Sequence, residues 1–426
     1  MTAQNSTIPA GWKETRLREV AFVNKLMIDK DYPLKEIEYI DVASVEERRL
    51  LQTQKIELNK APSRARRVVE NNNILISTVR PNLKHYCFIK KTKPNLIAST
   101  GFTVIGSQQG KSDPVFLYNL LTTTEYTNFL IKIADTQTST YPAFNPSVIL
   151  NSKILLPSLP EQKAIAAVLS SLDDKIELLR EQNKTLESLA QTIFKEWFVK
   201  FNFPNAKDKP YKENGGKMID SELGQIPEGW QVGKIKDLVD ILSGFAFSSS
   251  DFTQKGQYRL VTIKNVQDRH FDQETKDRLS KLPVKMPDYC KLKPGDILLS
   301  LTGNIGRICL VNGVNYLLNQ RVAKLKAKNS NDYAFSYLLF LQKSIFSLLQ
   351  STASGTAQQN LSPIQTREIK IVIADRNILD QFGKVGNDLL EKINKNLSQI
   401  QTLSTLRDTL LPKLMKGEVR VNGFNN

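Results

Sequence analysis

The chain has 426 residues, enough for more than one domain, and 59 basic against 43 acidic side chains give it a formal charge of +16. Such an excess is typical of a protein with a polyanionic partner, because neutralising phosphates releases counterions, although a merely soluble basic protein fits the charge equally well. No apolar run approaches the ~20 residues of a membrane span. Residues 1–12 also lack the apolar core of a secretory signal. We therefore expect a cytoplasmic protein with no membrane partner.

Sulfur and imidazole ligands are scarce. Cys87, Cys290 and Cys309 show no paired spacing, and His85 and His270 are the two histidines. This set matches no usual zinc-ligand pattern, so we predict no metal site and no cofactor in the chain. Three small buried thiols in a reducing compartment are the simplest interpretation.

The chain contains an internal repeat. Three pairs of segments correspond: 8–12 (IPAGW) with 226–230 (IPEGW), 73–77 (NILIS) with 296–300 (DILLS), and 140–149 (TYPAFNPSVI) with 356–364 (TAQQNLSPI). The second pair has the form of apolar strands that enter a polar turn. In the third pair we align Asn145 with Asn360.

The clearest repeated feature is a heptad pattern of apolar residues. Ile165 and Phe382 are 217 positions apart, as are Trp197 and Leu414, so the two heptad series superimpose with one shift. This spacing predicts a coiled-coil seam in each half, and the common shift indicates a duplication. The predicted seam residues are Ile165, Leu169, Leu172, Ile176, Leu179, Leu186 and Ile193 in the first half, and Phe382, Leu389, Ile393, Ile400, Leu403, Leu410 and Leu414 in the second.

The ends of these helices are also marked. Ser158 and Glu161 have the spacing of a capping box, and residues 161–200 would form a rod of roughly 60 Å at ~1.5 Å per residue. In the second helix Pro412 predicts an end or a kink near Leu411, because proline removes a backbone bond. Gly386 should weaken the first turns of that helix. Polar seam residues, namely Asn183, Asn396 and Arg407, would fix the register.

These patterns predict an α+β protein with a pseudo-twofold internal repeat. Two similar mixed domains would be separated by an antiparallel coiled coil of two long helices, which would carry them to opposite ends. Core helices of a single globular domain are the alternative. The predicted parts are a first mixed domain (1–157), a first helical region (158–203), a polar linker (204–225), a second mixed domain (226–374) and a second helical region (375–426).

The chain resembles the specificity subunits of type I restriction-modification systems. The resemblance rests on IPAGW and IPEGW, on residues 156–177 (LPSLPEQKAIAAVLSSLDDKIE), 186–201 (LESLAQTIFKEWFVKF), 212–230 (KENGGKMIDSELGQIPEGW) and 403–421 (LSTLRDTLLPKLMKGEVRV), and on their order. It implies that each mixed domain is a target-recognition domain that reads one part of a split, asymmetric site in double-stranded DNA. It further implies that the helices set the spacer, that two methyltransferase subunits dock on them, and that motor-nuclease subunits join for restriction. S-adenosylmethionine, ATP and magnesium would then belong to partner subunits.

Catalytic motifs are not found. Residues 106–112 (GSQQGKS) fall one residue short of a P-loop and lack its first glycine. Residues 145–148 (NPSV) lack the second proline and the aromatic residue of an adenine methyltransferase motif, and no G-x-S-x-G elbow occurs. We predict a non-catalytic recognition subunit with no catalytic residue. A scaffold with incidental charge and a self-contained nuclease or methyltransferase are the alternatives.

Candidate DNA contacts follow from residue type and position. Lys and Arg bind phosphates, while Arg, Asn and Gln make paired hydrogen bonds to bases. The candidates are Arg64, Arg66, Arg67, Arg80 and Lys84 in the first domain, and Lys264, Asn265, Gln267, Arg269, Thr302, Asn304, Arg307, Gln358 and Gln359 in the second. The resemblance transfers no individual base contact. We expect the aromatic cluster of Phe194, Trp197, Phe198 and Phe201 to pack at a helix end or against a partner rather than to stack on bases.

Overall fold

The computed structural model describes residues 8–29, 31–137, 142–353, 360–421 and 423. The chain divides into two compact units, the first made of residues 1–175 and 404–426 and the second of residues 176–403. Each unit mixes sheets and helices, so the predicted α+β class is confirmed. None of the helices in the described ranges combines the length and the apolar character that a membrane crossing requires.

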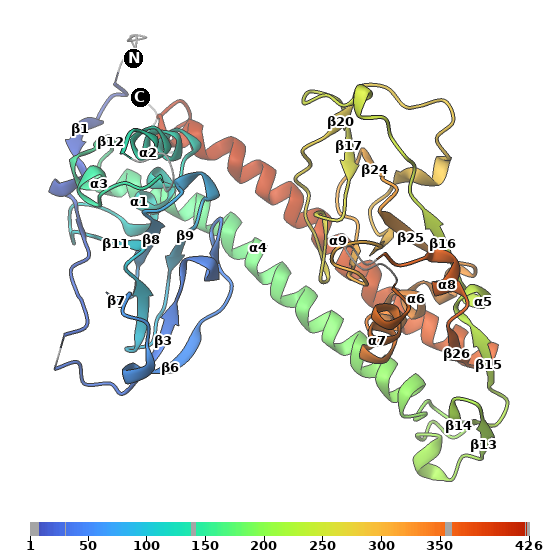
Figure 1. The fold of residues 1–426 in the computed structure, drawn as a ribbon. Coiled ribbons are helices and arrows are strands. Elements are labelled where there is room, and N and C mark those ends of the chain that lie inside the picture. The colour runs from blue at the N-terminus through green and yellow to red at the C-terminus, as the bar shows by residue number, and fades with distance from the viewer. Residues whose placement is uncertain (1–7, 30, 138–141, 354–359, 422, 424–426) are drawn as a thin grey trace. The chain divides into compact units, whose positions relative to one another are not determined.

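The first unit contains two four-stranded sheets (Figure 1). An antiparallel sheet has the order β2 (Ala21–Val23), β11 (Phe102–Ser107), β8 (Asn73–Ser77) and β9 (Tyr86–Ile89). A mixed sheet has the order β6 (Gln54–Glu57), β3 (Glu36–Ile40), β10 (Leu96–Ser99) and β7 (Ala65–Val68), in which β3 and β10 are parallel. Two short pairs are β1 (Lys13–Arg16) with β12 (Lys153–Leu156) and β4 (Val45–Glu46) with β5 (Arg49–Leu50).

The second unit repeats this topology. Its antiparallel sheet has the order β16 (Val239–Ser243), β25 (Val322–Ala327), β22 (Ile297–Ser300) and β23 (Ile308–Leu310). Its mixed sheet has the order β20 (Arg278–Leu279), β17 (Tyr258–Val261), β24 (Tyr316–Leu318) and β21 (Lys291–Leu292), again with a parallel central pair. The short pairs are β15 (Gln231–Lys234) with β26 (Lys370–Ile373) and β18 (Val266–Gln267) with β19 (His270–Phe271). The internal repeat predicted from the sequence is therefore confirmed.

Helices cover one side of the antiparallel sheet in each unit and supply its core. The first unit has α1 (Pro114–Leu121), α2 (Thr124–Gln137) and α3 (Ser147–Asn151), and the second has α5 (Ile235–Leu238), α6 (Tyr333–Phe340), α7 (Lys343–Thr352) and α8 (Pro363–Arg367). Phe116 of α1 packs with Ile74 of β8, and Phe335 of α6 packs with Ile297 of β22, each in one apolar cluster. The same layers are thus built twice.

The repeated sequence segments form the same local structures. In both IPxGW segments the tryptophan amide donates to the proline carbonyl, at 3.0 Å for Trp12 and Pro9 and at 3.1 Å for Trp230 and Pro227. The glycine between them has a φ of +77° in the first copy and +88° in the second, a region that favours glycine. Residues 73–77 and 297–300 form the corresponding strands β8 and β22.

One detail of the sequence alignment was wrong. Ala143 forms a bridge with Val79, and Asn360 forms the same bridge with Thr302, so Asn360 corresponds to Ala143 and not to Asn145. The counterpart of Asn145 is Ser362: the first accepts from the backbone amide of Ser147 and the second from that of Gln365, each beside a short helix. The two copies share the geometry of this turn but not its residue types, so an alignment by residue type paired the wrong positions.

Two long helices pack together in each unit. They are α4 (Leu159–Phe194), continued by a π-helical turn η5 (Lys195–Val199), and α9 (Arg376–Met415). In the first unit Ile165 and Leu169 share a core with Leu411 and Leu414. In the second unit Ala190 and Phe194 share a core with Phe382, Leu390 and Ile393. Within each unit the start of one helix lies against the end of the other, so the pairing is antiparallel.

The predicted seam residues differ in how deeply they lie. Some are buried and the others are half-buried, and half-buried ones such as Leu186, Leu389 and Leu410 still pack against the apolar cluster of their unit. The buried residues are Ile165, Leu169, Ile176, Leu179, Phe382, Ile393 and Leu414, and the half-buried ones are Leu172, Leu186, Ile193, Leu389, Ile400, Leu403 and Leu410.

Polar side chains also join the helices. Asn396 donates to the Oδ1 atom of Asn183 at 2.8 Å inside the second unit, as expected for a polar pair that fixes register. In the first unit Glu161, only 2 % exposed, accepts from the Nε and Nη2 atoms of Arg420 at 2.6 and 2.9 Å. The carboxylate of Glu161 therefore binds the segment after α9 and does not complete the capping box that the sequence predicts.

The proline and the glycine of the second helix both lie inside α9. It does not end at Leu411 but continues past Pro412 to Met415. A Cβ added at Gly386 would lie 2.8 Å from the Cβ of Ala334 on α6. The glycine therefore allows α6 to approach closely, and its cost in helix propensity is offset by packing.

The segment predicted as a polar linker is partly folded. Phe203 stacks on Tyr211 with ring centroids 4.6 Å apart, and β13 (Met218–Ser221) pairs with β14 (Gly224–Pro227). Phe198 at the end of the first long helix contacts Phe335, Phe382 and Trp230 at centroid distances from 4.9 to 5.9 Å. Helix-end packing of the aromatic cluster, as predicted, is confirmed.

Candidate nucleic-acid interface

The turn after β8 holds two cations in an unusual backbone conformation. Arg80 and Lys84 flank the short helix η4 (Pro81–Leu83) with φ angles of +48° and +55°. In the second unit the turn after β22 has Gly303 and Gly306 at the matching places, with φ angles of +69° and +79°. Left-handed backbone costs a non-glycine residue roughly 1–2 kcal/mol. Glycine would adopt this backbone conformation at lower cost, so two basic residues at these positions mark the turn as a candidate functional site.

Neighbouring segments hold this turn in place. The amide of Arg80 donates to the carbonyl of Pro142 at 2.8 Å, and its side chain is exposed. Lys84 donates to Glu47 Oε1 at 3.2 Å, while the Nδ1 atom of His85 contacts the carbonyl of Val45. The turn is thus a defined surface with a positive edge rather than a loose loop.

The three arginines near β7 have different surroundings. Arg64 donates to the hydroxyl of Tyr39 at 3.1 Å and to Asp41 at 2.8 Å, and these contacts raise the pKa of its guanidinium. Arg66 is exposed. Arg67 lies against the sulfur of Met27 at 3.3 Å, and partial burial lowers its pKa. Successive strand residues point to opposite faces, so Arg66 and Arg67 serve different surfaces.

In the second unit several candidates come together. Arg307 donates through Nη1 to Oε1 of Gln267, and Gly303 approaches Ile263 closely enough that a Cβ would lie 3.1 Å from the Cδ1 atom of that side chain. Asn304 and Lys264 are exposed beside them. The segments 262–269 and 300–307 therefore present one polar surface with hydrogen-bonding groups that suit base edges. Gln358 and Gln359 lie outside the described residues.

Two candidates in this surface are structural, which corrects the prediction. Asn265 is 1 % exposed; its Oδ1 accepts from Thr262, and its Nδ2 donates to the carbonyls of Asp272 and Glu274 at 2.9 and 2.6 Å. All of its hydrogen-bonding capacity serves the fold. Thr302 is 8 % exposed and takes part in a strand bridge, so its side chain is not presented at the surface.

Arg269 also has a structural counterpart. It occupies the β18–β19 turn with a φ of +58°, and Arg48 occupies the equivalent β4–β5 turn with a φ of +64°. Only 9 % of the Arg48 side chain is exposed, whereas 46 % of the Arg269 side chain is exposed. The two arginines therefore share a backbone position but not their exposure, and the DNA contact of Arg269 stays a prediction.

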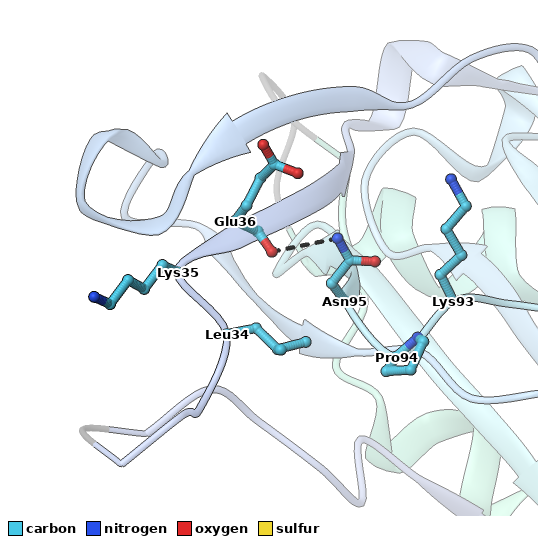
Figure 2. Close-up of a pocket in the computed structure, with 6 residues that line it drawn as sticks. All are labelled: Leu34, Lys35, Glu36, Lys93, Pro94 and Asn95. Carbon is cyan, nitrogen blue, oxygen red and sulfur yellow. Dashed lines mark hydrogen bonds between the residues drawn. The ribbon is translucent and has the colours of Figure 1, made fainter.

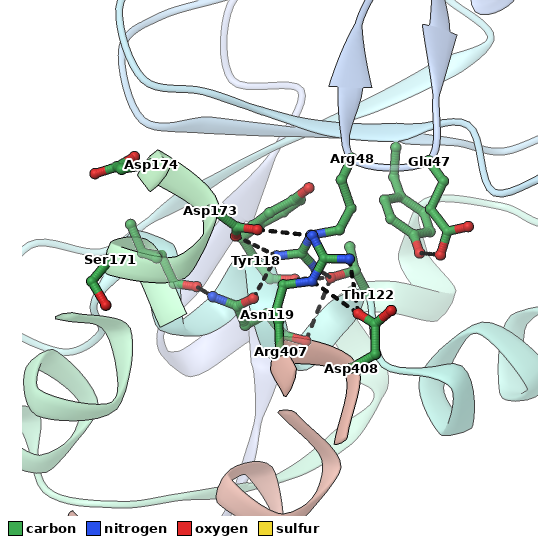
Figure 3. Close-up of polar contacts among 12 residues, drawn as sticks. Glu47, Arg48, Tyr118, Asn119, Thr122, Ser171, Asp173, Asp174, Arg407 and Asp408 are labelled. Atoms are coloured by element: carbon green, nitrogen blue, oxygen red, sulfur yellow. Dashed lines mark hydrogen bonds and ion pairs between the residues drawn. The ribbon is translucent and has the colours of Figure 1, made fainter. Parts of the chain in front are cut away.

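Figure 3 shows the cluster that surrounds Arg48 in the first unit. The guanidinium donates to Asn119 at 2.7 Å and to Asp173 at 2.9 Å, and it lies 4.7 Å from the centroid of the Tyr118 ring. Arg407 of α9 donates to the other oxygen of Asp173 at 2.9 Å. One carboxylate on α4 thus joins a domain turn to both long helices. The sequence predicted Arg407 as a polar seam residue but gave no signal for Arg48.

One hollow of the described surface offers no catalytic arrangement. It is lined by residues 34–36 and 93–95 in the first unit (Figure 2). Asn95 donates to the carbonyl of Glu36 at 3.3 Å, and the Glu36 carboxylate pairs with Lys55 at 2.7 Å. No base stands beside a nucleophile in this lining. Among the described residues, no three His, Cys, Asp or Glu side chains are grouped to hold a metal ion.

The cysteines are buried and unpaired. Burial raises the pKa of Cys87 to about 12 and also raises the pKa values of Cys290 and Cys309. A thiol with a raised pKa is a poor nucleophile at neutral pH. We therefore assign these side chains to the core.

The fold and the exposed polar turns define a protein with two repeated recognition domains on paired long helices. The chain matches the family described as the type I restriction modification DNA specificity domain over residues 9–188 and 227–399. It belongs to this family. It is accordingly the subunit of a type I restriction-modification complex that confers DNA sequence specificity, and it is a non-catalytic recognition component.

Curated relatives and a solved structure agree with this assignment. The chain is 25 % identical to the HindI specificity subunit of Haemophilus influenzae, over 96 % of the chain and 99 % of the relative. It is 29 % identical to the MjaIX specificity subunit of Methanocaldococcus jannaschii, over 83 % and 79 %. The crystal structure of the type I S subunit from M. genitalium is 17 % identical with a TM-score of 0.56, covering 97 % of each chain, and supports the fold.

Proposed function

We propose that the chain reads a bipartite, asymmetric site in double-stranded DNA, one part with each repeat. The observation that carries this proposal is that the same turn bears different side chains in the two units. After β8 it presents Arg80 and Lys84, whereas after β22 it presents Asn304 and Arg307. Equivalent turns with different hydrogen-bonding groups suit two different base sequences. The spacer between the two parts would be set by α4 and α9.

We further propose that two methyltransferase subunits dock on the long helices and that motor-nuclease subunits join for restriction. Large apolar side chains remain exposed there: Leu178 and Leu189 on α4 are 51 % and 47 % exposed, and Leu406 on α9 is 45 % exposed. Apolar groups exposed on a helix pair support a partner surface. S-adenosylmethionine, ATP and magnesium would be bound by those partners, and the buried free thiols fit a cytoplasmic location.

Mapping of methylated adenines tests the bipartite site. The chain is expressed with its methyltransferase partner in cells that lack other adenine methylation, and the methylated motif is read genome-wide. We expect two specified parts separated by unspecified bases. A single continuous motif, or methylation without sequence preference, would contradict the proposal.

Single substitutions then assign the parts to the units. Arg307→Ala and Asn304→Ala should relax one part of the motif and leave the other unchanged, whereas Arg80→Ala should affect only the opposite part. A bidentate contact is worth about 1–3 kcal/mol of discrimination, so one base position should become degenerate. Lys207→Ala in the segment between the repeats is the matched control and should leave both parts intact.

A further inference from the structure

Both units carry the same basic turn in the mixed sheet, in the connection between its two edge strands. Residues 60–65 (KAPSRA) connect β6 to β7, and residues 281–286 (KLPVKM) connect β20 to β21. The shared pattern is a basic residue, an apolar residue, proline, a variable residue, a basic residue and an apolar residue. We call these two segments the KxPxK/R turns.

The two turns have the same backbone. The amide of Ala65 donates to the carbonyl of Pro62 at 2.8 Å, and the amide of Met286 donates to the carbonyl of Pro283 at 3.1 Å. The last apolar residue is buried in each case, with Ala65 3 % and Met286 9 % exposed. Proline fixes one φ angle, so the geometry is rigid before any ligand binds.

The basic side chains of both turns project outward. In the first unit Lys60 and Arg64 are 69 % and 56 % exposed. In the second, Lys281 and Lys285 are exposed, and the variable residue between proline and lysine, Val284, is fully exposed at the tip. Each turn therefore presents two cations on either side of a rigid corner.

We propose that the KxPxK/R turns bind backbone phosphates of the DNA, one turn in each unit. This inference rests on the proposed function and adds residues to it. A bipartite, asymmetric target requires the base-reading side chains of the two units to differ, as they do after β8 and β22. What both halves of any duplex share is the phosphate backbone, so a feature conserved between the repeats suits that shared ligand. Lysine, a flexible point charge, meets a phosphate without demanding one geometry.

The two turns should not contribute equally. Glu57 pairs with Lys60 at 3.0 Å and Asp41 pairs with Arg64 at 2.8 Å, so acids partly neutralise the first turn. Across the described residues, neither Lys281 nor Lys285 has an acidic group within ion-pair distance. The second turn therefore offers more uncompensated charge to a phosphate, and its removal should cost more affinity.

The test compares Lys281→Ala/Lys285→Ala with Lys207→Ala/Lys209→Ala, which removes the same charge from exposed positions outside both sheets. The full chain with its methyltransferase partner is titrated, over a range of salt concentrations, with a duplex carrying the mapped target and with a scrambled duplex of equal length. We expect weaker binding of the first variant to both duplexes, an unchanged ratio between them, and a slope of log affinity against log salt reduced by about 1 to 2. Lys60→Ala/Arg64→Ala should show a smaller change of the same kind.

Three outcomes would overturn the proposal. A changed ratio between target and scrambled duplex would make these lysines base-reading. Affinities and slopes equal to those of the control would remove them from the interface. Normal DNA binding together with lost binding of the methyltransferase would assign the turn to that subunit. If instead the complex without substitutions binds the two duplexes equally, the result contradicts the proposed bipartite site and not the phosphate-binding role of the KxPxK/R turns.

Discussion

Asp173 receives the guanidinium of Arg48 at 2.9 Å within the first unit, and only 9 % of the Arg48 side chain is exposed. The same carboxylate accepts from Arg407 at 2.9 Å, whose side chain is 12 % exposed. Removal of the carboxylate would leave two cations with little access to water. We therefore expect Asp173→Ala to lower the free energy of unfolding by about 3 kcal/mol, near the lower limit for a broken buried pair because Asp173 is 28 % exposed.

Urea unfolding of the purified chain measures this change. The neighbouring residue provides the control, since Asp174 is 58 % exposed and pairs with Lys90, which is exposed as well. Asp174→Ala should change stability by less than about 1 kcal/mol. Equal effects of the two substitutions would show that the Asp173 contacts do not stabilise the fold.

The pair of Asn183 and Asn396 predicts a second result. Asn396→Ala removes one partner of a hydrogen bond in the seam, where Asn396 is 2 % exposed, and should destabilise the chain by about 1–3 kcal/mol. Replacing both asparagines by leucine should restore or exceed the original stability, because no polar group is then left unsatisfied. A double-mutant cycle in urea gives the coupling, and additive effects would argue against the pair.

The close packing of α6 against Gly386 predicts that alanine is less favourable than glycine at this helix position. Alanine normally stabilises a helix by about 1 kcal/mol relative to glycine. Here the new Cβ would lie 2.8 Å from the Cβ of Ala334, so Gly386→Ala should lower the thermal midpoint. Ser398→Ala at an exposed position of the same helix should leave it unchanged or slightly raised. If Gly386→Ala is instead more stable than the original, α6 can move away from α9 without cost.

Glu187 predicts a pH dependence. Burial raises the pKa of this carboxyl above its ordinary value of 4.5, and Tyr337 donates to its Oε1 atom at 3.0 Å. As pH rises above 4.5 the unfolded chain ionises first, so the contribution of Glu187 to stability falls. Glu187→Gln keeps an acceptor for Tyr337 without the charge. It should be more stable than the original at pH 8, with a difference that shrinks toward pH 4.5.

The matched control for this experiment is Glu181→Gln, at an exposed position of the same helix. Urea titrations of both variants at several pH values give the comparison. A difference for Glu187→Gln that is constant with pH would show that charge burial is not its cause.

The sequence predicted those features that depend on periodicity. The heptad series gave both long helices because burial of Phe382, Ile165 and their successors requires apolar residues at that spacing. The repeat predicted two similar mixed domains because IPAGW and IPEGW, and the strands that enter polar turns, are local signals. The sequence predicted an end or a kink near Leu411, and α9 does not end there, because Leu414 and Met415 pack in the core of the first unit.

The site was predicted less well. Residue type cannot distinguish Asn265, whose amide serves only the fold, from Asn304, whose side chain is exposed. Arg48 and Asp173 are 125 positions apart, and only the tertiary fold brings them together. Lys60 and Lys281 were not among the predicted contacts although the basic-x-Pro-x-basic pattern is repeated in the sequence, because this pattern alone does not show that both turns lie exposed at equivalent places of a sheet.

The spacer proposal predicts the outcome of lengthening both helices together. One heptad is inserted after Leu178 in α4 and one after Gln401 in α9, between the Asp173–Arg407 contact and the Asn183–Asn396 pair. A heptad keeps the apolar seam in phase. Seven residues add ~10 Å, so the spacer should lengthen by up to about three base pairs while both specified parts of the motif stay unchanged. A heptad in α4 alone should abolish the paired seam, and the same insertion after Lys207 should leave the motif unaltered. If lengthening both helices leaves the mapped spacer as it was, some feature other than α4 and α9 fixes the distance between the two parts of the site.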